Sequence, residues 1–346
     1  MVQGMYENAL AWIWRPARVG LPVLIFLLVS SCGVHPSNSQ PVEKPAAILS
    51  FSDADIQHAA EAALGENEGT IIAIDPADGR LRAVINPRLA FEQKFPPGST
   101  IKVFTTLAAM RAGILQPETR IACRRIYRKG SYEAVCTHRR INNELALRHA
   151  LGYSCNYYFS TIGDRLSSGS FFDELRRFGF GEKTGINAHE LAGTLNSDDW
   201  GPATAIGNDD HILTTPIQLL SAFSAIVNGG DLYTPRIATA DSFEASLIRH
   251  VEIPAATRKA IIEGMDGCVS FGSASESGLN KLPLDVIGKT GTSGSSNGFR
   301  TQGWFAGFLL KHKNLKEVRP DEVQLGFIVF IKKSHGSASA GVARDF

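Results

Sequence analysis

A serine and a lysine stand three residues apart where a turn leads into an apolar segment. The stretch 95–104 reads FPPGSTIKVF, so two prolines and a glycine precede Ser99 and Lys102. Apolar residues then recur at helical spacing, which predicts a helix that carries Ser99 in its first turn. Positions i and i+3 are neighbours on a helix, so the Lys102 amine can reach the Ser99 hydroxyl. A half-buried lysine can lose its proton and serve as the base that a serine nucleophile needs. The pair therefore predicts an activated nucleophile.

One S-x-x-K is expected by chance in roughly every chain of this length, so the pair needs partners. Acyl-transfer sites built on S-x-x-K also use an S-x-N loop and a K-T-G strand edge. S-x-N occurs at Ser154–Asn156 and at Ser295–Asn297. The first copy lies between a helical segment and an aromatic run that can hold it rigid, whereas the second lies in a Gly/Ser-rich loop. We therefore assign Ser154 and Asn156 to the site.

K-T-G also occurs twice. The copy Lys183–Gly185 follows a helix end and a turn, whereas Lys289–Gly291 follows the apolar run Leu284–Ile287, which predicts a strand. A lysine that points into a cleft from a strand edge fits the second copy, and the first copy is interpreted as a structural turn. The backbone N–H groups of Thr292 and Ser99 could together form an oxyanion hole. The residues assigned from this motif are Lys289, Thr290, Gly291 and Thr292.

The elements that would position these residues come from both ends of the chain. Ser52 and Asp55 form a capping-box pattern before an amphipathic helix. The runs TIIAID and LRAVIN flank a PADGR turn and predict a β-hairpin. Residues 99–227 are mostly helical in pattern, and the strand-like runs LDVIG, GWFAGFLL and VQLGFIVFI follow. Strands at both ends with helices between them predict an α+β domain whose sheet joins the two chain ends.

Composition and the N-terminal segment indicate where the protein works. The chain has 346 residues, a formal net charge of +1 and 44% hydrophobic residues, which is typical of a globular protein. No long basic run occurs, so nothing favours nucleic acid as a partner. Arg15 and Arg18 precede VGLPVLIFLLVSSCG, and this charged flank, apolar core and small residues before a cysteine are typical of a secretory signal.

The segment VSSC resembles a bacterial lipobox, which would make Cys32 the lipidated N-terminus. An uncleaved membrane anchor is the alternative, although the apolar run is short for a span of about 20 residues. The chain after it is rich in Pro, Ser and Asn, which predicts a linker. We expect a signal at 1–32, a linker at 33–50 and one domain at 51–346 that is tethered to the membrane outside the cytoplasm.

The motifs in this order resemble those of one enzyme family. PPGSTIK, YSCNYYF and GKTGTS resemble the three motifs of the transpeptidase domain of class B penicillin-binding proteins. FGFGEKTGI, AIGNDDHILTTPIQL, IVNGG and GWFAGF resemble segments between those motifs, and the resemblance covers about Gly69 to the end. It implies the penicillin-binding serine transpeptidase fold, an α+β fold with a five-stranded antiparallel sheet flanked by helices and an inserted all-helical subdomain.

The resemblance also implies a peptidoglycan D,D-transpeptidase of the cell envelope. A stem peptide ending in D-Ala-D-Ala would acylate Ser99, and an amine of a second stem peptide would then take the acyl group and form the cross-link. β-Lactams would acylate the same serine. Lys102 would be the base, Ser154 would relay a proton to the leaving amine, and Lys289 and Thr290 would hold the substrate carboxylate. This chemistry needs no metal or cofactor.

The sequence departs from the family pattern around the catalytic motifs. Fewer than 40 residues separate Cys32 from Gly69, where class B enzymes usually carry a pedestal domain. The absence of a pedestal domain implies a position close to the membrane or dependence on a cell-wall synthesis partner. The chain stops at HGSASAGVARDF, where the family's last helix would begin, so apolar surface on the sheet is expected to be exposed. A serine β-lactamase, a D,D-carboxypeptidase and a non-catalytic β-lactam sensor or scaffold are the alternative functions.

The cysteines raise a separate question. An even set in an exported protein favours disulfides. The spacing C…C…SC, however, resembles a segment of elongation-type class B enzymes. If Ser154 and Asn156 face the cleft, Cys155 between them should face away from it, into the protein. A Cys₃His zinc site, a Cys123–Cys136 disulfide and plain buried thiols are then the alternatives. The residues of the zinc alternative are Cys123, Cys136, His138 and Cys155.

Overall fold

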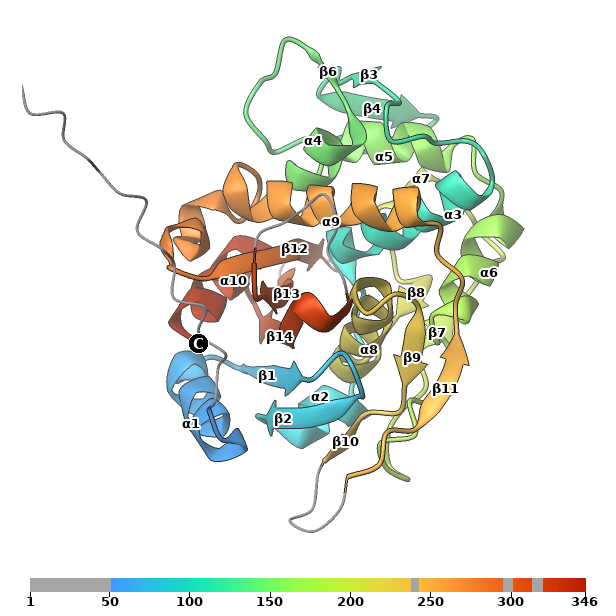
Figure 1. The fold of residues 1–346 in the computed structure, drawn as a ribbon. Coiled ribbons are helices and arrows are strands. Elements are labelled where there is room, and N and C mark those ends of the chain that lie inside the picture. The colour runs from blue at the N-terminus through green and yellow to red at the C-terminus, as the bar shows by residue number, and fades with distance from the viewer. Residues whose placement is uncertain (1–50, 238–242, 295–300, 313–319) are drawn as a thin grey trace, which may run out of the picture. The chain divides into compact units, whose positions relative to one another are not determined.

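A mixed β-sheet forms the centre of the fold in the computed structural model, which describes residues 51–237, 243–294, 301–312 and 320–346 (Figure 1). Its strand order is β10-β2-β1-β14-β13-β12. The bounds of these strands are β1 Gly69–Ile74, β2 Arg80–Val84, β10 Arg236–Ile237, β12 Asp285–Gly294, β13 Thr301–Leu310 and β14 Val323–Lys332. Strand β1 pairs with β14, so the sheet joins the two ends of the domain as predicted.

The sheet has one strand more than the five-stranded antiparallel sheet that the resemblance implied. The pairs from β2 to β12 are all antiparallel, but the short strand β10 adds to the free edge of β2 in parallel. The backbone N–H of Arg236 also bonds the Gly79 carbonyl in the turn before β2. The sheet therefore has six strands and is mixed. Strand β10 is only two residues long, Arg236 and Ile237, which is too short for an alternating pattern to predict a strand.

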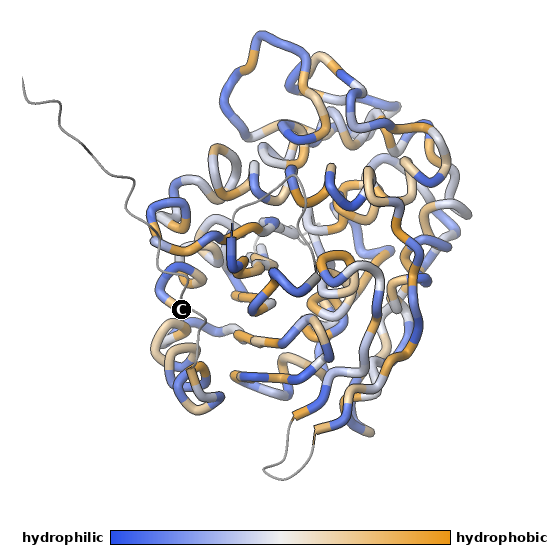
Figure 2. Tube along the Cα trace, viewed as in Figure 1, coloured by the Kyte–Doolittle hydropathy of each residue, from blue (hydrophilic) through white to orange (hydrophobic). Residues whose placement is uncertain are grey.

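Both faces of the sheet are covered, which explains why its strands read as nearly continuous apolar runs. Figure 2 shows mostly apolar residues along the central strands and mostly hydrophilic ones on the loop that leads from β5 (Tyr132–Val135) to β6 (Glu144–Leu145). One face packs against α1 (Asp53–Leu64), which begins with the predicted capping box of Ser52 and Asp55, and against α10 (Gly336–Asp345). The expected loss of the last helix is corrected for this segment, because HGSASAGVARDF forms α10, which covers part of this face.

The other face packs against the inserted part of the chain. This part was expected to be all-helical, but it also contains short antiparallel strand pairs between residues 121 and 213. Helix α8 (Pro216–Val227) is buried along its whole length. Phe104 of α3 (Lys102–Arg111) lies at the centre of this core, with its ring against those of Phe178, Phe180 and Phe223. The other helices of this part are α4 Leu147–Gly152, α5 Asn156–Gly163, α6 Ser168–Arg177 and α9 Ala255–Ser270.

Short elements connect these layers. They are α2 Pro87–Glu92, α7 Pro202–Ala205, the 3₁₀ turns η1 Gly98–Ile101, η2 Ser275–Ser277, η3 Leu279–Lys281 and η4 Pro320–Glu322, and the strands β3 Ile121–Ala122, β4 Ile126–Lys129, β7 Thr194–Leu195, β8 Ile212–Leu213, β9 Asp231–Tyr233 and β11 Leu247–His250. Within the described ranges, no helix is long and apolar enough to cross a membrane. The expected signal, Cys32 and the linker lie outside the described residues.

Candidate active site

Ser99 lies in the 3₁₀ turn η1 rather than in the first turn of an α-helix, because α3 begins at Lys102. The Lys102 backbone N–H bonds the Ser99 carbonyl, whereas the Lys102 amine bonds the S-x-N loop rather than the Ser99 hydroxyl. Gly98 has φ 55°, and a Cβ there would lie 2.6 Å from the Thr292 carbonyl oxygen, so a glycine is required. The Trp304 indole N–H donates to the Pro96 carbonyl at 3.0 Å and holds the turn from behind. The nucleophile candidate thus sits on a rigid turn against β12.

Lys102 is fully buried and points at the S-x-N loop. Its Nζ donates to the Ser154 carbonyl at 2.7 Å and to Asn156 Oδ1 at 2.6 Å, and lies 3.3 Å from Ser154 Oγ. Burial, and after it the charge of Lys289, lowers the pKa of Lys102 well below its ordinary value. A neutral amine has two hydrogens, which the two carbonyl oxygens use, and one lone pair. The lone pair stays available to accept a proton.

Ser154 stands in a strained turn between α4 and α5, and Asn156 is the first residue of α5. Ser154 has φ 54°, a left-handed conformation that is uncommon for a residue with a side chain and that concentrates at functional sites. Its Oγ accepts a hydrogen bond from Lys289 Nζ at 2.9 Å. Asn156 donates from Nδ2 to the Val135 carbonyl at 2.8 Å, which ties the loop to the β4–β5 hairpin. The hydroxyl of Ser154 is therefore held between two lysine amines.

Lys289 is on β12 at the edge of the sheet, as predicted from the apolar run before it. It is fully buried, and its Nζ also donates to the Thr290 carbonyl at 2.9 Å. Burial lowers the pKa of Lys289 to about 8. The strand runs beside the Ser99 turn, since a Cβ on Gly291 would lie 2.7 Å from the Pro97 carbonyl oxygen. Thr292 Oγ1 accepts the Gly336 N–H at 3.0 Å, which fixes the strand to α10.

The structure separates the two K-T-G copies. Lys183–Gly185 is a turn in which the buried Glu190 carboxylate accepts hydrogen bonds from the Thr184 N–H and hydroxyl and from the Gly185 N–H. Lys183 Nζ donates to the Ala188 carbonyl, away from the S-x-N loop. The second S-x-N copy, Ser295 and Asn297, lies outside the described residues. Among the described residues, the Ser99 hydroxyl makes no hydrogen bond.

The side chain of Cys155, between Ser154 and Asn156, lies in the protein interior next to other sulfur atoms. Its side chain is fully buried, and its Sγ lies 3.6 Å from Cys136 Sγ. Cys123 Sγ lies 3.6 Å from Cys136 Sγ and 3.7 Å from His138 Nε2. All four ligand atoms lie within 4.8 Å of one another. Three sulfurs around zinc at about 2.3 Å would stand about 3.8 Å apart, which these distances approach.

The chemistry of this sulfur cluster also fits a metal. The sulfur atoms are free thiols, and each accepts a backbone N–H, from Arg125 to Cys123, from Tyr157 to Cys136 and from Tyr158 to Cys155. Such donors stabilise anionic sulfur. His138 Nδ1 lies 2.8 Å from the Arg139 carbonyl, which favours the tautomer that leaves Nε2 free to bind a metal. The hydrogen bond from Cys155 lowers the pKa of Cys136. The residues therefore suit a Cys₃His zinc site.

Two neighbours of the motifs were not predicted from the sequence. Ser273 lies next to Thr290, with 2.5 Å between the hydroxyl oxygens. No motif pointed to it, because the contact joins the turn after α9 to β12. Gly207 packs on the nucleophile turn, since a Cβ there would lie 2.2 Å from the Gly98 carbonyl oxygen. Its segment, AIGNDDHILTTPIQL, resembled the family, and that resemblance was the available signal.

Comparison with known proteins agrees with this geometry. The family model of the penicillin binding protein transpeptidase domain matches residues 69–317. Stage V sporulation protein D of Bacillus subtilis is 35% identical over 177 residues, which are 47% of this chain and 26% of that protein. Peptidoglycan D,D-transpeptidase MrdA of Acinetobacter baumannii is 24% identical over 295 residues, which are 72% of this chain and 42% of that protein. The chain thus matches less than half the length of either relative.

A solved structure shows the same fold. The crystal structure of Pseudomonas aeruginosa PBP2 in complex with WCK 5153 superimposes with a TM-score of 0.72 at 22% identity, over 84% of this chain and 76% of that one. The homology to peptidoglycan D,D-transpeptidases is distant, but the matched family model covers well over half of the chain. The chain therefore belongs to the penicillin-binding protein transpeptidase domain family, and its homologues are class B penicillin-binding proteins.

Proposed function

We propose that the protein is a serine D,D-transpeptidase that cross-links peptidoglycan stem peptides through an acyl-enzyme on Ser99. The observation that carries this proposal is the hydroxyl of Ser154, held 2.9 Å from Lys289 Nζ and 3.3 Å from Lys102 Nζ. Two buried lysines with lowered pKa values around one hydroxyl form a path for a proton between the nucleophile and a leaving group.

Acylation would use the neutral amine of Lys102. Its lone pair takes the proton of the Ser99 hydroxyl while the serine oxygen attacks the carbonyl carbon of the D-Ala-D-Ala bond. The backbone N–H groups of Ser99 and Thr292 receive the oxyanion. The proton then passes through Ser154 to the nitrogen of the departing D-Ala, and the C–N bond breaks. An ester on Ser99 and a free D-Ala amine result.

Transfer would reverse these steps with a new amine. The amine of a second stem peptide attacks the ester carbonyl and gives a proton to Ser154 and Lys102. The Ser99 oxygen regains a proton as it leaves, and an amide cross-link remains. Lys289 is protonated near neutral pH because its pKa is about 8. In the earlier acylation step it would bind, together with Thr290, the terminal carboxylate that departs with D-Ala.

We further propose that Cys123, Cys136, His138 and Cys155 hold a structural zinc ion. When bound, the metal would supply a rigid tetrahedral link and no reactive group. Cys155 lies between Ser154 and Asn156, so the cluster fixes the loop that carries both. This support needs no substrate contact, since Cys155 and Cys136 are buried behind the loop.

The alternatives differ in what they require of the pocket around Lys102. A class D β-lactamase drives water with a carbamylated lysine in an apolar pocket. Here Asn156 Oδ1 accepts directly from Lys102 Nζ, which makes that pocket polar. This contact favours transfer to an amine over hydrolysis by a carbamylated lysine. A D,D-carboxypeptidase or a non-catalytic sensor would keep the same contacts and is distinguished by experiment.

The site of action follows from the family and from the N-terminal sequence. Members of the family work in the extracytoplasmic cell envelope, and we propose that Cys32 carries a lipid anchor there. A similar fold, with a TM-score of 0.68, occurs in a structure titled "Structural coordination of polymerization and crosslinking by a peptidoglycan synthase complex". We therefore propose a glycan-polymerising protein as a partner.

Intact-mass analysis tests the function. The protein is incubated with benzylpenicillin, and separately with a D-Ala-D-Ala stem-peptide mimic with and without an acceptor amine. A long-lived penicillin adduct, together with a cross-linked product that forms only with the amine, is expected. Rapid loss of the adduct would show a hydrolase, product D-Ala without cross-linking would show a carboxypeptidase, and an adduct without any peptide turnover would show a sensor.

A further inference from the structure

Three X–H groups form a chain behind the K-T-G strand. Ser273 Oγ and Thr290 Oγ1 lie 2.5 Å apart, Cys268 Sγ lies 3.3 Å from Ser273 Oγ, and a longer contact of 3.9 Å joins Cys268 Sγ to Thr290 Oγ1. Cys268 is fully buried on α9, and Thr290 is nearly so on β12. No step of the proposed acyl transfer uses Ser273 or Cys268.

Ser273 is held rigidly by its backbone. Its N–H donates to the carbonyl of Gly152, the last residue of α4, at 3.0 Å. The approach there is close, since a Cβ on Gly272 would lie 2.0 Å from the Gly152 carbonyl oxygen. The neighbouring Ala274 N–H donates to the Cys268 carbonyl at 2.9 Å. Ser273 therefore joins α4, which leads into the S-x-N loop, to the strand that carries Thr290.

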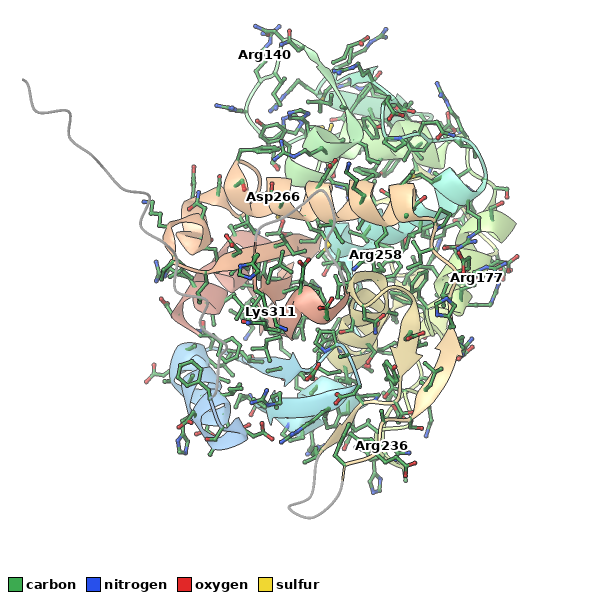
Figure 3. All side chains as sticks on the ribbon, in the orientation of Figure 1. Arg140, Arg177, Arg236, Arg258, Asp266 and Lys311 are labelled. Carbon is green, nitrogen blue, oxygen red and sulfur yellow. The ribbon has the colours of Figure 1, made fainter. Side chains whose placement is uncertain are left out.

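Helices α4 and α9 are held together at this turn by an ion pair and by close backbone packing. Asp266 lies on α9 (Figure 3) and accepts a hydrogen bond from Arg148 of α4 at 2.8 Å. A Cβ on Gly152 would lie 2.9 Å from the Gly267 carbonyl carbon, so the two helices meet backbone to backbone. The Ser273 hydroxyl thus has a fixed position relative to Thr290.

The direction of the hydrogen bonds among Cys268, Ser273 and Thr290 decides whether the Thr290 hydroxyl can donate to a substrate. A threonine hydroxyl has a single hydrogen, and it can donate to a substrate carboxylate only if it does not donate to Ser273. When Ser273 donates to Thr290, the Thr290 hydrogen is free for the cleft. The thiol of Cys268 can in turn donate to Ser273. A substrate carboxylate favours the arrangement in which Cys268 donates to Ser273 and Ser273 donates to Thr290. Each of these hydrogen bonds then strengthens the next.

We propose that Ser273 is a positioning residue that presents the Thr290 hydroxyl as a donor to the terminal carboxylate of the substrate. This inference rests on the proposed acyl-transfer function. It predicts that loss of the Ser273 hydroxyl weakens recognition of the carboxylate specifically, while acylation by a compound without that carboxylate is hardly affected.

The same turn offers a matched control. Ser275 is also half-buried, and its hydroxyl donates to the Gly272 carbonyl at 2.8 Å instead of to β12. Ser275→Ala also removes one hydroxyl from this turn, but that hydroxyl bonds the Gly272 carbonyl and not Thr290. Ser273→Thr keeps a hydroxyl at the position and serves as the conservative rescue.

The experiment compares two penicillins. Second-order acylation rates are measured by intact mass for benzylpenicillin and for its methyl ester, which lacks the charged carboxylate. Ser273→Ala should lower the acid-to-ester rate ratio about tenfold, which corresponds to about 1.4 kcal/mol. Ser273→Thr should restore most of the ratio, and Ser275→Ala should leave it unchanged.

Each other outcome overturns a defined statement. If Ser273→Ala slows both compounds equally, or slows neither, Ser273 does not act through Thr290 and the positioning role is wrong. An equal loss of the ratio in Ser275→Ala would show that the turn, not the hydroxyl, is responsible. If the wild-type protein is acylated by neither compound, the acyl-transfer function itself fails, and this inference fails with it.

Discussion

Lys289 gives the sharpest test of the site because the chain contains its own control. In Lys289→Ala, the Ser154 hydroxyl loses the donor at 2.9 Å and the cleft loses a buried cation. Lys183, in the other K-T-G copy, donates a hydrogen bond to the Ala188 carbonyl in its own turn. Lys183→Ala should therefore leave acylation unchanged, whereas Lys289→Ala should slow it strongly.

The magnitude follows from the contact that is lost. A hydrogen bond to a charged group contributes about 2–3 kcal/mol, which corresponds to a roughly 30- to 150-fold loss of rate if it forms with the substrate carboxylate. A second effect has a defined sign. The charge of Lys289 contributes to lowering the pKa of Lys102, so its removal lets the Lys102 pKa rise. Less neutral base is then present at pH 7, and the acid limb of the rate profile moves to higher pH.

The assay is the second-order rate of acylation by benzylpenicillin between pH 5 and pH 10, measured for the wild type and both variants. The methionine variant Lys289→Met keeps much of the side-chain volume, and it should lose as much rate as the alanine variant while melting at a similar temperature. Equal rate losses for Lys183→Ala and Lys289→Ala would refute the assignment of the motif. A loss in Lys289→Ala with an unmoved acid limb would refute the coupling between the two lysines.

Three further predictions address the nucleophile, the pH range and the metal. Ser99→Ala should abolish penicillin labelling with an unchanged melting temperature, since the change removes one half-buried oxygen, and a labelled variant would move the nucleophile elsewhere. Wild-type acylation should decline above about pH 8 as Lys289, whose pKa is lowered to about 8, loses its proton; a rate that keeps rising to pH 10 would contradict this. Purified, unreduced protein should contain zinc by elemental analysis, and chelation should lower both its melting temperature and its acylation rate. Zinc-free protein that has lost two thiols would instead show a Cys123–Cys136 disulfide.

Much of the frame was predictable because local patterns determine it. The capping box at Ser52 and Asp55 and the hairpin of β1 and β2 depend on neighbours in the chain, and both were found where the sequence indicated. The strand that carries Lys289 was also predictable, because a buried edge strand reads as an apolar run before the motif.

The remaining features depend on contacts between distant segments. Ser99 sits in a 3₁₀ turn because Gly98 must pass close to the Thr292 carbonyl, a contact that no local pattern encodes. The sixth strand, β10, exists only because β2 offers a free edge. The role we infer for Ser273 depends on the packing of α9 against both α4 and β12. The K-T-G motif identifies Lys289 and Thr290 from the sequence, whereas the contact of Ser273 with Thr290 becomes visible only in the fold.

The pairing of β1 with β14 has a consequence for how the chain reaches its native state. Gly69 pairs with Ile331, so strand β1, which is buried at all six positions, pairs with a strand from the far end of the chain. If the chain crosses a membrane N-terminus first, β1 emerges long before β14. Contacts of such long sequence separation form slowly, and unpaired apolar strands aggregate. Newly exported chains would then need a holding chaperone until the last strand arrives, and truncation before β14 would leave a chain that cannot complete its sheet.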